Sequence, residues 1–158
     1  MSERVPLTPG GKAKLQEEIS KLKTGDRPKI VKEIEAARAH GDLSENAEYH
    51  AAKDKQGQIE GRIRFLEDLF SRAEVIDPSK ADGKRIVFGV CVRLYDSASD
   101  QEFVYRIVGE WEADAPRGHV SVTSPVARAL IGKEEGDVVV VRTPGGEREL
   151  EIVEIIVE

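Results

Sequence analysis

The most constraining feature of this sequence is a run of residues spaced alternately three and four positions apart from Tyr49 to Ala73. Such spacing places one side chain per turn on a single face of an α-helix and extends over about three and a half heptads. Every position of the run except Gln56 is apolar or aromatic. The pattern therefore predicts a long amphipathic helix whose seam packs against a second helix. The seam residues are Tyr49, Ala52, Gln56, Ile59, Ile63, Leu66, Phe70 and Ala73.

The preceding segment carries the same pattern with one interruption. Apolar spacings of three and four run from Leu15 to Leu22 and again from Ile30 to Ala37, but the step from Leu22 to Ile30 is eight. Gly25-Asp26-Arg27-Pro28 lies within that step, and an internal proline removes a helical hydrogen bond. We therefore expect a kink or a short break here, with Asp26 capping the helix that follows.

Only a few residues around Gly41-Asp42 join the two helical segments. The first helix is expected to begin at Thr8-Pro9, because threonine caps helices well and proline fits their first turn. A connection this short must fold two amphipathic helices back on each other as an antiparallel hairpin. Residues 1–77 are therefore predicted to form a coiled-coil arm, with its acidic tip at residues 41–45.

Beyond Ile76-Asp77-Pro78 the hydrophobic period changes to two, first from Phe88 to Leu94 and then in later stretches. Thr143-Pro144-Gly145-Gly146 has the composition of a hairpin turn. One short helix is expected over Ser124–Gly132, with serine as its cap, proline in its first turn and glycine at its end. Residues 79–158 are thus predicted to form a domain with an antiparallel sheet of about five strands and one short helix, which makes the fold class α+β.

Charge and cysteine content narrow the functional class. A net charge of -6 argues against a broad surface for duplex DNA, so any nucleic-acid contact should be local and a protein partner is the better expectation. Cys91 is the only cysteine, which excludes an intramolecular disulfide and is typical of a reducing cytosol. Its neighbours Val90 and Val92 predict a core position for it. No apolar run approaches the ~18 residues of a membrane span, so we expect a cytoplasmic protein without a membrane partner.

The predicted tip admits two interpretations. Asp42 stands three residues before Glu45, which is the spacing of a capping box that satisfies the first N–H groups of a helix. Two carboxylates at this spacing also share a face and offer the hard oxygen ligands that Mg²⁺ prefers. Two carboxylates alone make an incomplete metal site, so the second interpretation suits a factor that completes another protein's two-metal centre.

Two segments resemble the signatures of a known family. Gly41-Asp-Leu-Ser-Glu-Asn-Ala-Glu-Tyr49 is similar to the first signature of the Gre transcript-cleavage factors, and residues 121–132 resemble the second. The similarity extends from about Pro6 to the C-terminus and is to the GreA type. The resemblance implies a coiled-coil arm that enters the secondary channel of bacterial RNA polymerase. It also implies an FKBP-like C-terminal domain that docks at the rim of that channel.

The resemblance also implies roles for individual residues. Asp42 and Glu45 match the tip carboxylates, which help to hold a second Mg²⁺ that is shared with the polymerase active site and is not bound stably by the isolated protein. Arg38 and Lys53 match basic positions that face the nascent RNA 3′ end, a role that fits local phosphate contact. Tyr49 matches an aromatic residue placed near the same RNA end. From the residues alone, Arg38 and Lys53 could equally be solvated helix charges and Tyr49 a seam residue.

Ser124 and Pro125 match the family's polymerase-docking loop, although a Ser-Pro pair also begins many helices. The implied protein is a monomeric elongation factor that stimulates the polymerase's own Mg²⁺-dependent cleavage of backtracked RNA and so rescues arrested complexes. It is not itself an enzyme. An alternative is a non-cleaving inhibitor that occupies the secondary channel, against which the presence of both Asp42 and Glu45 argues. A free-standing nuclease would lack ligands, and a prolyl isomerase would lack aromatic residues for its pocket.

Overall fold

The computed structural model describes residues 3–41 and 46–158, which form two compact units. One unit is built on residues 12–73, and the other on residues 4–11 together with residues 74–158. This division differs from the predicted boundary between residues 77 and 79, because residues 4–11 belong with the second part of the chain. No helix in the described ranges is long and apolar enough to cross a membrane.

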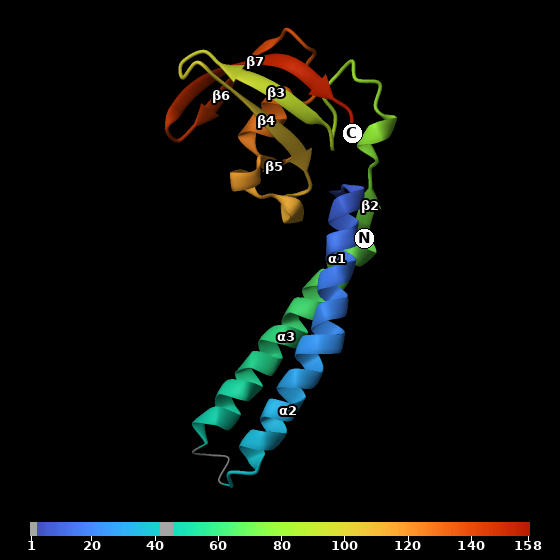
Figure 1. The fold of residues 1–158 in the computed structure, drawn as a ribbon, viewed down its shortest axis with the longest axis vertical. Coiled ribbons are helices and arrows are strands. Elements are labelled where there is room, and N and C mark those ends of the chain that lie inside the picture. The colour runs from blue at the N-terminus through green and yellow to red at the C-terminus, as the bar shows by residue number, and fades with distance from the viewer. Residues whose placement is uncertain (1–2, 42–45) are drawn as a thin grey trace. The chain divides into compact units, whose positions relative to one another are not determined.

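Three α-helices and one π-helical turn form the arm, and α2 and α3 lie side by side along it (Figure 1). The predicted antiparallel hairpin is thereby confirmed. Helix α1 begins at Pro9, and the N–H of Gly11 donates to Oγ1 of Thr8 at 3.0 Å, which confirms Thr8 as its cap. In chain order the elements are α1 (Pro9–Lys21), the π-helical turn η1 (Leu22–Asp26), α2 (Arg27–Arg38) and α3 (Ala47–Arg72).

The π-helical turn η1 accommodates the eight-residue step in the hydrophobic pattern. Asp26 and Arg27 both have helical backbone angles, and the Asp26 side chain makes no capping hydrogen bond. The helix therefore continues without a break, and the predicted recapping by Asp26 is wrong. The N–H of Arg27 instead donates to the carbonyl of Leu22, five residues earlier. A π-helical turn holds one more residue than an α-helical turn, so Leu22 and Ile30 both pack toward α3 despite their longer spacing.

The seam between the helices is apolar, as the spacing predicts. Leu22 and Ile34 pack at its edge, and each fully buried isoleucine contributes roughly 1.5–3 kcal/mol. Helix α3 ends at Arg72, one residue before the predicted end of the seam, because Ala73 has extended backbone angles. The buried residues of the seam are Ile30, Ala52, Ile59 and Ile63.

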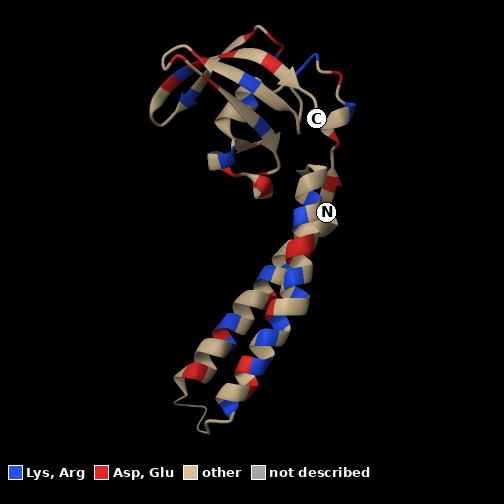
Figure 2. Ribbon diagram, viewed as in Figure 1, with Lys and Arg blue, Asp and Glu red and all other residues tan. Residues whose placement is uncertain are grey.

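Salt bridges cross between the two sides of the hairpin, and basic and acidic residues are interspersed along both of them (Figure 2). Arg27 and Glu60 form the best of these, with two nitrogen–oxygen distances of 2.8 and 2.9 Å. Solvent screens exposed pairs of this kind, so each contributes little to stability. They favour one register of the helices more than they stabilise the hairpin. The others are Lys23–Glu67 at 2.8 Å, Arg62–Glu18 at 3.0 Å and Lys55–Glu33 at 3.8 Å.

A two-stranded sheet, which was not predicted, explains why residues 4–11 group with the later part of the chain. Strand β1 (Val5–Leu7) pairs with strand β2 (Ala73–Val75). The N–H of Ile76 then donates to the carbonyl of Leu7 at 2.9 Å. Strands of three residues carry too little periodicity to be recognised from sequence.

The main sheet has five strands in the order β5-β4-β3-β7-β6, which matches the predicted number. Its pairings are antiparallel except that of β4 with β5, which is parallel. The expectation of a wholly antiparallel sheet is corrected at this edge. Helix α4 (Pro125–Leu130) is the one predicted short helix. The strands are β3 (Cys91–Asp96), β4 (Gln101–Val108), β5 (His119–Ser121), β6 (Val138–Thr143) and β7 (Gly146–Ile156).

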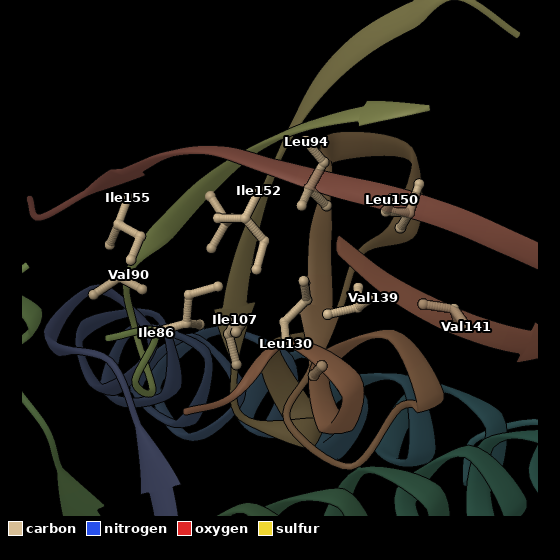
Figure 3. Packing of buried hydrophobic residues seen from close by; sticks show 12 residues of the cluster. Ile86, Val90, Leu94, Ile107, Leu130, Val139, Val141, Leu150, Ile152 and Ile155 are labelled. Atoms are coloured by element: carbon tan, nitrogen blue, oxygen red, sulfur yellow. The ribbon is translucent and has the colours of Figure 1, made fainter. Parts of the chain in front are cut away.

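Short 3-10 turns complete this unit: η2 (Pro78–Lys80), η3 (Glu110–Glu112) and η4 (Ala115–Arg117). Its core lies on one face of the sheet, where side chains from β3, β4, β6 and β7 meet Ala127 and Leu130 of α4 (Figure 3). Cys91 is only partly buried, so its predicted core position is corrected. Strand alternation explains this, because Val90 and Val92 both point into the core and Cys91 must point to the other face.

Candidate functional site

The candidate site lies where the hairpin turns. Asp42 and Glu45, the two predicted metal-binding carboxylates, lie outside the described residues. On the near side, the N–H groups of His40 and Gly41 donate to the carbonyls of Ala37 and Arg38, both at 3.2 Å, so the end of α2 tightens into turns. Gly41 has a φ of 105°, a conformation that strongly favours glycine. The chain thus leaves α2 through a turn that depends on Gly41.

Asn46 begins the far side of the turn and caps α3. Its Oδ1 accepts the backbone N–H of Tyr49 at 3.0 Å, and its Nδ2 donates to the carbonyl of Ala37 at 2.6 Å. The capping box predicted at Asp42 and Glu45 is therefore wrong for α3, because the helix begins at Ala47 and Asn46 is its cap. Asparagine immediately before the helix was a usable signal, since it is among the best N-cap residues.

An exposed contact between His40 and Glu48 also spans the turn. Nε2 of His40 lies 3.2 Å from a carboxylate oxygen of Glu48, in the first turn of α3. The two side chains are 63% and 75% exposed, so solvent screens the interaction and it adds little to stability.

The three residues predicted to meet RNA lie on both helices near this turn. Arg38 is the last residue of α2 and is exposed. Lys53 is exposed on α3, where its Nζ donates to Oε1 of Gln56 at 3.1 Å. Tyr49 is partly buried and its ring makes an edge contact with the His50 ring at 5.6 Å. Tyr49 and Lys53 are four residues apart on α3 and therefore share one face of that helix.

Ser124 and Pro125, the predicted docking residues, belong to the other unit and begin α4. Oγ of Ser124 accepts the N–H of Ala127 at 3.2 Å, and Pro125 occupies the first helical position and is exposed. Before them, the hydroxyls of Ser121 and Thr123 lie 2.7 Å apart and hold the preceding turn. The capping role of Ser124 is confirmed, and the exposed ring of Pro125 remains accessible.

Within residues 3–41 and 46–158, no group of three or more histidine, cysteine, aspartate or glutamate side chains could hold a metal ion. Asp42 and Glu45 are the candidate metal ligands at the tip. Two carboxylates are the right chemistry for Mg²⁺ but supply fewer ligands than a complete protein site. They fit an ion whose other ligands come from elsewhere.

Comparisons with known proteins cover nearly the whole chain. A family model described as transcription elongation factor, N-terminal, matches residues 5–75, and one described as transcription elongation factor, GreA/GreB, C-term, matches residues 80–156. A protein of Anaeromyxobacter sp. strain K named Transcription elongation factor GreA is 62% identical over 150 residues, which is 95% of this chain and 90% of that protein. A protein of the same name from Brucella anthropi is 57% identical over 151 residues, or 96% of each.

Among solved structures, the crystal structure of GreA factor homolog 1 of Thermus thermophilus matches with 30% sequence identity. The match covers 97% of this chain and 99% of that chain, with a TM-score of 0.44.

Proposed function

The chain belongs to the GreA/GreB family of transcription elongation factors, and from that premise we propose that it binds bacterial RNA polymerase and stimulates the polymerase's own cleavage of backtracked RNA. The observation that carries the proposal is a helical hairpin, with Asp42 and Glu45 in the sequence that joins its helices, in a chain that matches the family over both of its halves. Cleavage at the RNA 3′ end would return arrested complexes to elongation.

In this proposal the arm delivers its carboxylates to the polymerase active site through the secondary channel. Helix α3 alone has 26 residues, which corresponds to roughly 39 Å at ~1.5 Å per residue. Asp42 and Glu45 would hold a second Mg²⁺ together with acidic groups of the polymerase. When bound, that ion would polarise the phosphodiester and stabilise the charge that develops during hydrolysis. Every other catalytic group belongs to the polymerase, so this chain is an accessory factor and not an enzyme.

Arg38, Lys53 and Tyr49 would contact the extruded RNA in this proposal. The exposure of Arg38 and Lys53, on opposite helices near the turn, supports a pair of local phosphate contacts. Tyr49 is only partly buried, so part of its ring is available to a base or a ribose. These contacts would position the RNA without recognising its base sequence.

Ser124 and Pro125 would meet the rim of the channel and anchor the factor. Pro125 is exposed at the start of a helix whose other face packs into the core through Ala127 and Leu130, so its ring is rigidly presented. Because bacterial RNA polymerase works in the cytoplasm, the proposal places the protein there. We propose that it acts as a monomer.

A transcript-cleavage assay tests the proposal. The purified protein is added, with Mg²⁺, to stalled and backtracked elongation complexes, and the length of the nascent RNA is followed over time. We expect faster cleavage near the RNA 3′ end with polymerase present and no cleavage of RNA when polymerase is omitted. Binding to polymerase without cleavage would favour the non-cleaving channel inhibitor. Cleavage without polymerase would favour a free-standing nuclease.

A further inference from the structure

Asn46 makes two hydrogen bonds, although capping α3 requires only one of them. Its Oδ1 holds the N–H of Tyr49 in the first turn of α3, while its Nδ2 reaches the carbonyl of Ala37 near the end of α2. One planar amide therefore joins the two helices at the point where the chain leaves one and enters the other. The hydrogen bond to the Ala37 carbonyl is partly buried, and a hydrogen bond shielded from solvent is stronger than one in water.

We infer that Asn46 is a positioning residue for the cleavage reaction, and this inference rests on the proposed function. The segment that carries Asp42 and Glu45 runs between Gly41 and Asn46. By tying Asn46 to Ala37, the amide fixes the separation of the two ends of that segment. Carboxylates that share an ion with another protein must be held within a fraction of an ångström, and a misplacement of about 1 Å can reduce a rate by roughly 100-fold.

Asparagine is suited to both hydrogen bonds, because its side-chain amide has one acceptor and one donor group. Aspartate caps a helix about as well as asparagine but has no N–H to donate. An aspartate at position 46 would also face the carbonyl oxygen of Ala37, 2.6 Å from the present Nδ2, with a second acceptor. Serine and threonine can cap and donate, but their hydroxyl is one bond closer to the backbone and so reaches less far. Only the bond to Ala37 distinguishes a positioning role from capping alone.

Two substitutions separate these roles. Asn46→Asp keeps the cap and removes the bond to Ala37, whereas Asn46→Ala removes both. Gln58→Glu is the matched control, because it makes the same amide-to-acid change at an exposed position of the same helix. Each variant is examined for helix melting, for competition with the unaltered protein for polymerase, and for the rate of RNA cleavage at saturating factor.

A measurement without polymerase tests the positioning itself. Spin labels are attached through Glu35→Cys and Ala51→Cys, on exposed positions of α2 and α3, in a Cys91→Ser background. We expect a narrow distribution of label distances in the parent protein and in Gln58→Glu, and a broader or shifted one in Asn46→Asp. An unchanged distribution in Asn46→Asp would overturn the inference whatever the polymerase assay shows.

In the cleavage assay, we expect Asn46→Asp to lower the saturated rate between about 10-fold and 100-fold, while the concentration of factor needed for half the effect stays unchanged. The Mg²⁺ concentration that gives half the maximal rate should rise. A loss confined to Asn46→Ala would mean that Asn46 only caps α3, and the inference would fail. If the parent protein stimulates no cleavage while the label distances still broaden in Asn46→Asp, the tie between the helices stands, but its role in cleavage falls with the proposed function.

Discussion

Glu112 accepts hydrogen bonds from both the backbone N–H and the hydroxyl of Thr8, which lies 104 residues earlier in the chain. The same carboxylate accepts the N–H of Gly109 at 2.9 Å, and Thr8 in turn caps α1 through the N–H of Gly11. A Cβ atom at Gly11 would overlap the Glu112 carboxylate, so a larger residue there would force that side chain to move. One carboxylate thus joins η3 to the segment from which α1 begins.

Removing this carboxylate should destabilise the second unit. In Glu112→Ala the N–H groups of Thr8 and Gly109 lose their acceptor, and since Thr8 is buried we expect the free energy of unfolding to fall by about 3 kcal/mol. Urea denaturation of the full chain measures this. Glu110→Ala, at an exposed position of the same 3-10 turn, should change stability by less than about 0.5 kcal/mol. Equal losses in both variants would contradict the assigned role of Glu112.

Deleting Gly25 should convert η1 into α-helix without unfolding the hairpin. The deletion removes the one extra residue that the π-helical turn holds, so the spacing between Leu22 and Ile30 becomes a regular heptad. It also removes a helical glycine, which costs about 1 kcal/mol relative to alanine. We expect an equal or higher melting temperature by circular dichroism.

The matched control deletes Asp54, an exposed residue of α3. Helix α3 contains no π-helical turn, so this deletion should rotate Tyr49 and Ala52 away from the seam and lower the melting temperature. A larger loss on deleting Gly25 than on deleting Asp54 would contradict the account of η1.

The ion pair between Arg27 and Glu60 should make the arm sensitive to acid. The hydrogen bonds from the Arg27 guanidinium lower the pKa of Glu60 below its ordinary value, against a smaller opposing effect of desolvation. A carboxylate with a lowered pKa in the folded state stabilises it above the unfolded pKa of about 4.3, and this contribution disappears as pH falls through the folded pKa. The melting temperatures of the parent protein and Glu60→Gln should therefore converge between about pH 6 and about pH 3.

Asp54→Asn removes an exposed carboxylate from the same helix and serves as the control for this pH series. A difference between the parent protein and Glu60→Gln that stays constant over the whole pH range would mean that the charge of Glu60 contributes nothing.

The periodicities of the sequence predicted the larger elements because those elements are long or strongly patterned. The seam from Ala52 to Ile63 repeats over several turns, and the cap and first turn of α4 at Ser124 and Pro125 use residues with narrow conformational preferences. Cys91 could also have been placed correctly, since a residue between two inward-facing strand residues points outward. The apolar character of its neighbours alone predicts a core position, whereas the strand period predicts the other face.

Other features depend on contacts that no local pattern contains. The pairing of β1 with β2 and the hydrogen bonds between Thr8 and Glu112 join residues far apart in sequence. The eight-residue step at Leu22 showed that the helix phase must shift, but a break and a π-helical turn satisfy the same spacing. At the tip, Asp42 and Glu45 have the spacing of a capping box, but Asn46 is the cap of α3.

Replacing Arg38 and Lys53 together with alanine should weaken the contact with extruded RNA and leave polymerase binding intact. Both side chains are exposed on the arm, so their phosphate contacts should be screened by salt. We expect a reduced cleavage rate in about 50 mM salt and a smaller difference from the parent protein in about 200 mM salt. Lys14→Ala with Lys21→Ala, which removes the same charge from exposed positions of α1, should have little effect. Unchanged cleavage at low salt would mean that Arg38 and Lys53 are solvated helix charges that do not contact RNA.

The central claim is that Asp42 and Glu45 act through their charge at a shared ion, and the double variant Asp42→Asn, Glu45→Gln tests it most directly. Helix α3 begins at Ala47 and is capped by Asn46, so replacing Asp42 and Glu45 with amides should barely change the melting temperature or the competition for polymerase. The charge that Mg²⁺ requires is lost. The measurement is the rate of RNA cleavage in stalled, backtracked complexes at saturating factor. We predict a fall of roughly 100-fold or more, whereas full cleavage activity in the double variant would contradict the claim.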